Sequence, residues 1–258
     1  FLKKISAIYN TSKSDDNNVY LGIRCRRPKP HTVFLDQELY ITDFLHAYGF
    51  SAVRPAATPT SGSQLSKSQC PIEQSEKDAM SKHPYRHIIG SLCYLEQCTR
   101  PDIAFALNRL SRYQVNPGLP HWNELKHLVR YVAGTRQHGI LFGKNSYPQH
   151  AALQYDLSGP LECFVDSDHA ADKDTRRSTT GYVFYSRGGP ISWRSRLQNS
   201  TAISTTEAEF MAASDAACEN AWLRRLIGEL TNISCTRING LLIPKDIAAP
   251  KLSQRFYD

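Results

Sequence analysis

The chain of 258 residues is 41% hydrophobic and 21% charged, which is typical of a globular protein with one large domain or two ordinary ones. No run approaches about 18 apolar residues and the first residues lack the apolar core of a secretory signal, so we expect an intracellular protein without a membrane span, in a cytoplasmic particle or the nucleus. Seven cysteines without a Cys-x-x-Cys pair argue against a disulfide framework or a zinc site, and the net charge of +7 fits either a polyanionic partner or a solvated basic face.

The first third of the chain predicts a small β-and-α unit. Residues 1–18 turn polar after the first few and predict an unpacked leading segment, cut from something longer. The β-prone stretches 19–24 and 32–35 predict the two strands of a hairpin. Apolar residues at near-helical spacing predict a short helix over 36–48, and Gly49 ends it.

A change of composition follows, and then a helical region. The stretch 51–81 is rich in Pro, Ser, Thr, Ala and Gln, which predicts a linker between domains or a loop across a surface. Residues 85–113 predict two helices separated near Pro101, which suits the first turn of the second helix. A third helix is expected over 121–133, capped by Gly134.

The second half predicts a sheet followed by a long helix. β-prone runs predict strands at 139–142, 161–166, 180–185 and 191–195. Ser204 and Glu207 have the spacing of a capping box, and a helix of about 25 residues should follow, ending near Leu230. At about 100° per residue, one sector of that helix collects its core-facing side chains. They are Ala208, Ala212, Ala216, Trp222, Leu223, Leu226, Ile227 and Leu230.

The helical wheel assigns different roles to two early glutamates. Glu207 lies roughly opposite the apolar sector, so we expect it to cap the helix. Glu209 lies at the edge of the sector, facing the sheet, where a carboxylate needs a charged partner. That partner is either a divalent metal ion or one of the arginines nearby. Asp166 ends a predicted strand and Asp168 follows on the same face, as metal ligands or as turn-forming residues.

Several motifs together resemble one family. In the second half they are Asp166-Ser-Asp-His-Ala-Ala-Asp, Arg176-Arg-Ser-Thr-Thr-Gly-Tyr-Val-Phe, Gly189-Pro-Ile-Ser-Trp-Arg-Ser and Ser204-Thr-Thr-Glu-Ala-Glu-Phe-Met-Ala. Upstream they include Tyr85-Arg-His-Ile-Ile-Gly-Ser-Leu-Cys-Tyr-Leu and Thr99-Arg-Pro-Asp-Ile-Ala-Phe-Ala. These motifs resemble the Pol polyproteins of Ty1/copia-type retrotransposons. The resemblance covers residues from about 19 to 230 in the family's order.

The resemblance implies an α/β (α+β) fold with a partial, mainly helical reverse transcriptase thumb and connection, then an incomplete ribonuclease H-like mixed sheet with helices. The implied regions are 1–50 at the end of the palm and thumb, 51–82 as linker or surface loop, 83–150 as helical thumb and connection, and 160–258 as the ribonuclease H-like domain, C-terminally truncated or divergent. The family's Tyr-x-Asp-Asp polymerase motif is absent from this sequence, so we do not expect DNA synthesis.

For the site, the resemblance implies that Asp166 and Glu209 are metal-binding carboxylates that hold Mg²⁺ or Mn²⁺. Asp246 is the best stand-in for the third carboxylate, although Pro244 is awkward in a central strand and the family's adjacent Asn is replaced by Ile247. A site that lacks one or two ligands would bind metal weakly. The arginines expected to contact nucleic acid are Arg176, Arg177, Arg194 and Arg196.

Three hypotheses follow. The first is a fragment of a copia-type polyprotein whose ribonuclease H-like domain hydrolyses RNA in RNA·DNA hybrids, with the remainder of the Pol polyprotein as partner. The second is a non-catalytic, nucleic-acid-binding remnant of a transposable element. The third is a degenerate product without function, poorly folded for want of its later strands.

Overall fold

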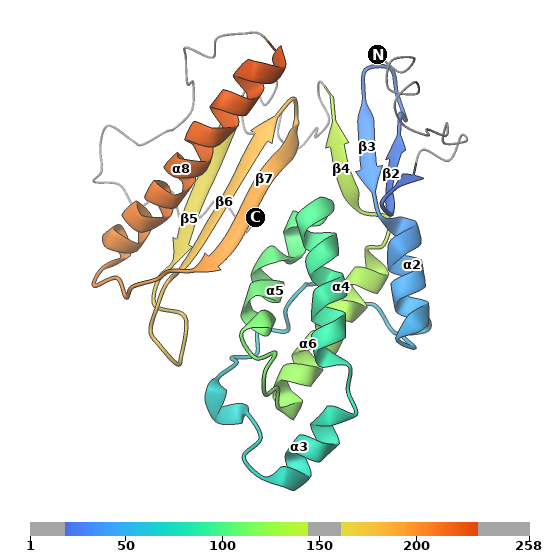
Figure 1. The fold of residues 1–258 in the computed structure, drawn as a ribbon, viewed down its shortest axis with the longest axis vertical. Helices are drawn as coiled ribbons and strands as arrows, with labels where there is room; N and C mark the ends of the chain where they lie inside the picture. Colours follow the sequence, from blue (N-terminus) through green and yellow to red (C-terminus); the bar gives the residue numbers. More distant parts are fainter. Residues whose placement is uncertain (1–18, 144–160, 232–258) are drawn as a thin grey trace, which may run out of the picture.

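The computed structural model describes residues 19–143 and 161–231, with side chains as far as Glu229. Its elements are β1 (Val19–Tyr20), β2 (Ile23–Arg26), β3 (Val33–Asp36), α2 (Glu38–Ala47), the 3-10 turn η1 (Lys67–Gln69), α3 (Gln74–Ser81), α4 (Tyr85–Cys98), the 3-10 turn η2 (Pro101–Ile103), α5 (Ala104–Ser111), α6 (Leu119–Gly134), β4 (Gly139–Phe142), β5 (Glu162–Asp168), β6 (Thr179–Ser186), β7 (Gly189–Leu197) and α8 (Thr205–Thr231). In Figure 1 the helices α2–α6 lie below two antiparallel sheets, so the fold is of the α+β class. No helix within these ranges is long and apolar enough to cross a bilayer.

The first sheet has the strand order β1-β2-β3-β4. The predicted hairpin is confirmed, because Arg24 on β2 lies opposite Asp36 on β3. The predicted strand over 19–24 is interrupted, however, by Leu21 and Gly22, whose φ angles are 50° and 74°. Because a left-handed backbone makes a tight turn, the stretch becomes two short antiparallel strands. β4 completes the sheet by pairing with β3 from a distant part of the sequence.

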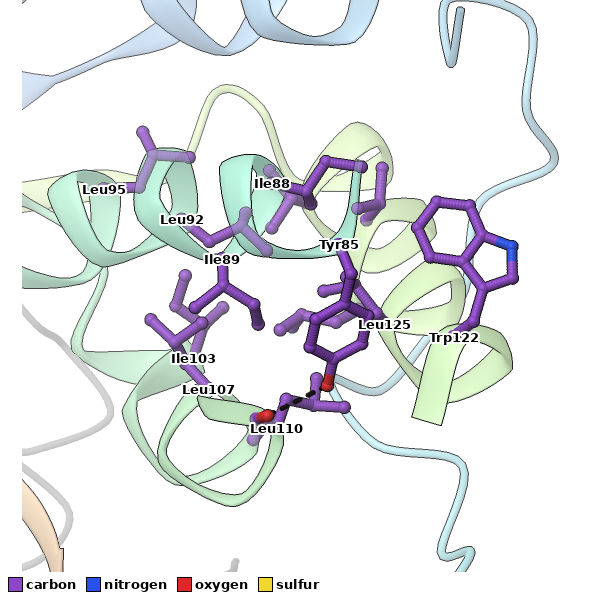
Figure 2. Close-up of a cluster of buried hydrophobic side chains, with 14 of the residues drawn as sticks. Tyr85, Ile88, Ile89, Leu92, Leu95, Ile103, Leu107, Leu110, Trp122 and Leu125 are labelled. Carbon is purple, nitrogen blue, oxygen red and sulfur yellow. Dashed lines mark hydrogen bonds between the residues drawn. The ribbon is translucent and has the colours of Figure 1, made fainter. Parts of the chain in front are cut away.

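The helices α4, α5 and α6 enclose the larger hydrophobic core (Figure 2). The predicted break is confirmed, since α4 ends at Cys98 and Pro101 begins the turn that leads into α5. The Tyr85 hydroxyl donates a hydrogen bond of 2.9 Å to the Leu110 carbonyl, which joins the start of α4 to the end of α5. Fully buried aliphatic side chains each contribute about 1.5–3 kcal/mol. They are Ile41, Ile88, Ile89, Leu92, Leu95, Ile103, Leu125, Leu128, Val129 and Val132.

The third helix, α6, begins earlier than predicted, at Leu119, with Pro120 in its first turn. Gly134 was predicted to cap the helix, but it is the last helical residue and Thr135 is the cap. A Cβ atom on Gly134 would lie 2.8 Å from the Cβ of Pro55. Glycine is therefore required at position 134 because another chain segment passes close to it, and not because the helix ends in a left-handed cap.

The segment 51–82 follows the surface of α6. The Ser61 N–H donates to a carboxylate oxygen of Glu124 at 2.9 Å, and the Ala56 N–H donates to the Arg130 carbonyl at 3.3 Å. The segment also contains η1 and α3, which the sequence pattern did not predict because neither has a continuous apolar stripe. Its description as a boundary between domains stays a prediction.

The second sheet has the order β5-β6-β7, and α8 crosses one face of it (Figure 1). Tyr182 and Phe184 of β6 are buried against Ala216 and Leu223 of α8. The small side chains Ala208, Ala212 and Ala216 are all fully buried, as the helical wheel predicted. Trp222 was placed in the same sector, and this prediction is wrong, because its side chain is 55% exposed. At about 100° per residue Trp222 lies about 80° from Ala212, at the edge of the sector that the buried alanines define.

Polar contacts join the second sheet and its loop to the helical part. The Trp193 indole N–H on β7 donates to the carbonyl of Glu96 at 3.0 Å. Arg112 at the end of α5 forms an ion pair of 2.9 Å with Asp172 in the loop after β5. Asp174 in the same loop accepts an N–H hydrogen bond of 2.9 Å at the start of η1. Residues at the end of α5 and at the start of η1 therefore hold the loop that follows β5 in place.

Candidate functional site

Asp166 lies near the end of β5, opposite Gly181 on β6, so β6 places no side chain beside it. The Ser167 N–H donates to Asp166 Oδ1 at 2.8 Å, which orients the half-buried carboxyl group. β5 continues to Asp168, so Asp166 and Asp168 point to the same face of the sheet, as the alternation predicted.

The start of α8 is organised by the predicted cap. The Ser204 hydroxyl accepts a hydrogen bond of 3.1 Å from the Glu207 N–H. The Glu207 carboxylate accepts one of 2.7 Å from the N–H of Ile203, just before the cap residue. The exposed Glu207 therefore serves the start of the helix, as predicted, although its carboxylate accepts from the Ile203 N–H rather than from the Ser204 N–H that a capping box would use.

Replacing Glu207 by Ala is expected to destabilise the protein by about 1 kcal/mol, because the N–H group of Ile203 loses its acceptor. Chemical denaturation measures this change. Glu229→Ala is the control, since Glu229 is an exposed carboxylate at the other end of α8 and its loss should stay within about 0.5 kcal/mol. Equal losses in the two variants would contradict the capping role.

Glu209, two residues further along α8, meets Asp166. The two carboxyl groups lie within hydrogen-bonding reach of each other, so their protonation is linked. Burial and the nearby charge of Asp166 raise the pKa of Glu209 from 4.5 to about 7. Burial also raises the pKa of Asp166. Both acids are thus shifted toward their protonated forms, and Glu209 titrates near neutral pH.

The alternative partner for Glu209, an arginine, is not what the fold provides. In residues 19–143 and 161–229 no ion pair involves Glu209, whereas Arg196 pairs with Asp215 two turns further along α8, at 2.8 Å. The described part of the chain also contains no group of three or more His, Cys, Asp or Glu residues that could hold a metal ion. Asp246, the predicted third ligand, lies outside the described residues. The geometry therefore brings together two of the three predicted carboxylates.

Asp168, whose charge contributes to the raised pKa of Asp166, lines a cleft between the helical part, including α5, and the loop after β5. The cleft has a volume of about 220 Å³ and includes Arg109, Arg112, Tyr113 and Lys173 in its walls. The Arg109 guanidinium donates to a backbone carbonyl at 2.8 Å, and Arg112 is paired with an aspartate, so each cation is already engaged.

No family model and no solved structure matches the chain. The chain is 41% identical over 213 residues to the retrovirus-related Pol polyprotein from transposon TNT 1-94 of Nicotiana tabacum. The matched residues make up 81% of this chain and 15% of the relative. It is 35% identical to the retrovirus-related Pol polyprotein from transposon RE2 of Arabidopsis thaliana, over 89% of this chain and 14% of the relative. The uncharacterized mitochondrial protein AtMg00810 of Arabidopsis thaliana is 30% identical, over 85% of this chain and 83% of the relative.

The chain belongs to the family of copia-type retrotransposon Pol polyproteins. The resemblance inferred from the motifs is therefore confirmed. The chain spans about one seventh of the length of the two transposon relatives named above, since it covers 14–15% of them. It thus corresponds to one region of a copia-type polyprotein.

The arginines predicted to contact nucleic acid in this copia-type chain differ in solvent exposure and in ion pairing. Arg176 and Arg194 are exposed, and Arg177 is half-buried. Arg196 is half-buried and paired with Asp215. Their contact with nucleic acid stays a prediction. Many of the arginines that cluster in the sequence serve internal ion pairs instead, notably Arg24, Arg26, Arg100 and Arg112.

The sequence predicted no role for three buried polar residues near the acid pair. Asp172, Ser178 and Gln198 are buried around the loop and strand end next to the pair. In the sequence each stands where a turn or a strand ends, and polar residues are common there for local reasons. Asp172 accepts a local hydrogen bond from the Thr175 N–H, but its ion pair with Arg112 and the contacts of Gln198 join segments distant in the chain, which no local pattern indicates.

Proposed function

We propose that this region of a copia-type Pol polyprotein hydrolyses the RNA strand of RNA·DNA hybrids in a divalent-metal-dependent reaction. The observation that carries the proposal is the pair of neighbouring carboxyl groups of Asp166 and Glu209, set on a strand and a helix. A bound Mg²⁺ or Mn²⁺ would supply charge stabilisation for phosphodiester hydrolysis. Asp166 and Glu209 would hold it, with Asp246 as the candidate for a third ligand.

The donor set suits such an ion. Carboxylate oxygens are the ligands that Mg²⁺ and Mn²⁺ prefer. The raised pKa of Glu209 reflects burial and the repulsion between two carboxylates, and a divalent cation would relieve that repulsion. The same two groups would otherwise have to be protonated or destabilise the fold, so the arrangement favours cation binding over a purely structural role.

The proposed substrate is a polyanion, which the net charge of +7 favours. A hybrid would be recognised by its shape, its phosphates and the 2′-hydroxyls of its RNA strand rather than by base sequence. The exposed Arg176 and Arg194 are the first candidates for phosphate contacts. The remainder of the Pol polyprotein is the proposed partner, and it would supply DNA synthesis, for which this sequence lacks the Tyr-x-Asp-Asp motif.

The test is cleavage of an end-labelled RNA·DNA hybrid by the purified chain, with Mg²⁺ or with a chelator. Asp166→Asn and Glu209→Gln are expected to lower the rate by about 10²- to 10³-fold. Glu207→Gln is the matched control, because it makes the same change two residues away on an exposed carboxylate that caps the helix. Duplex RNA and duplex DNA serve as non-substrates. Cleavage that survives in Asp166→Asn would contradict the proposal.

A second candidate is a non-catalytic nucleic-acid-binding remnant. It is favoured by the finding that the described residues bring together no group of three potential metal ligands. Hybrid binding that depends on salt but not on Mg²⁺, with no cleavage in the wild-type chain, would support this candidate and reject the enzyme.

A further inference from the structure

Gln198 follows directly on the last residue of β7 and is only 2% exposed. Its backbone N–H donates to the Ser178 carbonyl at 2.8 Å. Its side-chain Nε2 donates to the Ala208 carbonyl at 2.9 Å and to the Thr180 hydroxyl at 3.2 Å. One buried amide therefore links the end of β7, the start of β6 and the first turns of α8.

The partners of this amide are neighbours of the two acids. Ala208 precedes Glu209 directly in α8. Thr180 lies opposite Ser167 in the ladder between β6 and β5, and Ser167 follows Asp166. The Gln198 side chain thus connects the backbone beside one acid to the strand pair that carries the other.

The orientation of the amide is set by its surroundings. The Ala208 carbonyl can only accept a hydrogen bond, so the NH₂ group must face it. The other end, Oε1, is buried without a hydrogen-bond partner. A buried polar atom without a partner is destabilising, and an apolar side chain of similar shape would avoid this loss. Stability alone therefore does not explain a glutamine at this position.

We propose that Gln198 is a positioning residue, which sets the separation of the Asp166 and Glu209 carboxyl groups by fixing the first turns of α8 against β6. The inference rests on the proposed function of that pair as a site for a divalent cation. Without the amide, α8 is held here mainly by alanine contacts, which are not directional. The helix can then shift, and the two carboxylates no longer meet one ion.

The experiment measures Mn²⁺ binding to the full chain without nucleic acid, by the electron paramagnetic resonance signal of free Mn²⁺. Gln198→Met keeps the length of the side chain and removes its amide. Gln37→Met is the matched control, because Gln37 is also a fully buried glutamine with one paired and one unpaired amide atom. It lies at the start of α2, in the other part of the molecule.

The affinity for Mn²⁺ is expected to fall by about 10- to 100-fold in Gln198→Met, as for other residues that orient metal ligands. Gln37→Met should keep the wild-type affinity while losing comparable stability. Wild-type affinity in Gln198→Met, or an equal loss in the two variants, would overturn the inference. If the wild-type chain binds no Mn²⁺ that Asp166→Asn removes, the proposed function fails first, and this inference with it.

A milder variant covers the case in which Gln198→Met does not fold. Thr180→Val removes one of the two acceptors of the amide and leaves the bond to Ala208 in place. It should lower the affinity for Mn²⁺ in the same direction but by less. Unchanged affinity in folded Thr180→Val would then overturn the inference.

Discussion

Replacing Glu209 by Gln is expected to make the metal-free protein more stable at pH 8 by about 1–2 kcal/mol, while it removes the proposed affinity for divalent cations. The pKa of Glu209 is raised to about 7 in the fold, from an ordinary value of 4.5. For an isolated group such a shift corresponds to about 3 kcal/mol, and we discount it because Glu209 is partly exposed and solvent screens its charge. A glutamine in its place carries no charge to repel Asp166.

The pH dependence has a definite sign. Between about pH 4.5 and 7 the folded chain retains a proton on Glu209 that the unfolded chain has lost, so stability falls as the pH rises through this window. Denaturation of the wild type and of Glu209→Gln should give similar stabilities near pH 4.5 and diverge toward pH 8. Glu207→Gln should show no such divergence. A constant difference across the window would contradict the raised pKa.

The same protonation should govern metal binding. Because a cation needs the ionised carboxylate, the affinity for Mn²⁺ is expected to fall by about tenfold for each pH unit below 7. The gain in stability on losing Glu209 and the loss of metal binding would then have one cause, the placement of two acids side by side.

Replacing Arg100 by Met is expected to destabilise the protein by about 2–3 kcal/mol, because a buried guanidinium loses its hydrogen bonds. The Arg100 side chain is 1% exposed and forms two hydrogen bonds with the Asp102 carboxylate, at 2.9 and 2.7 Å. It also donates to the carbonyl of Thr135, just after α6. Although burial favours the neutral acid, Arg100 holds the pKa of Asp102 below its usual value. Without Arg100 the Asp102 carboxylate, whose side chain is 34% exposed, loses its cationic partner and keeps the Tyr131 hydroxyl, while the carbonyl of Thr135 loses a donor.

Thermal or chemical denaturation at neutral pH measures this effect. Arg196→Met is the matched control, because Arg196 also pairs with an aspartate but both side chains are about one third exposed. Its loss should change the stability by about 0–1 kcal/mol. Similar losses for the two arginines would contradict the idea that burial decides the contribution of the pair.

Most secondary structure followed from local pattern. The break at Pro101 and the long helix after Ser204 were predicted, because proline chemistry, capping and apolar spacing act over a few residues. The strand over 19–24 was predicted as one piece, and only the left-handed φ angles at Leu21 and Gly22 divide it. The exposure of Trp222 could not be predicted, because a helical wheel ranks directions and not the distance to the sheet.

The candidate site was predictable to the extent that it depends on one helix. Periodicity distinguished Glu207 from Glu209, and the structure gives Glu207 the cap and Glu209 the contact with Asp166. The choice between a metal and an arginine as partner of Glu209 was left open by the sequence. It depends on which strand the helix crosses, and that is a matter of tertiary packing.

By itself, the sequence determined the family, the order of the elements and the faces on which Asp166 and Glu209 lie, since motifs and periodicity are local properties of the chain. Only the tertiary structure brought these two acids together and raised the pKa of Glu209 by burial and mutual repulsion. It alone also placed the Gln198 amide between β6 and α8, because a hydrogen bond to the Ala208 carbonyl requires the end of β7 to meet the start of α8.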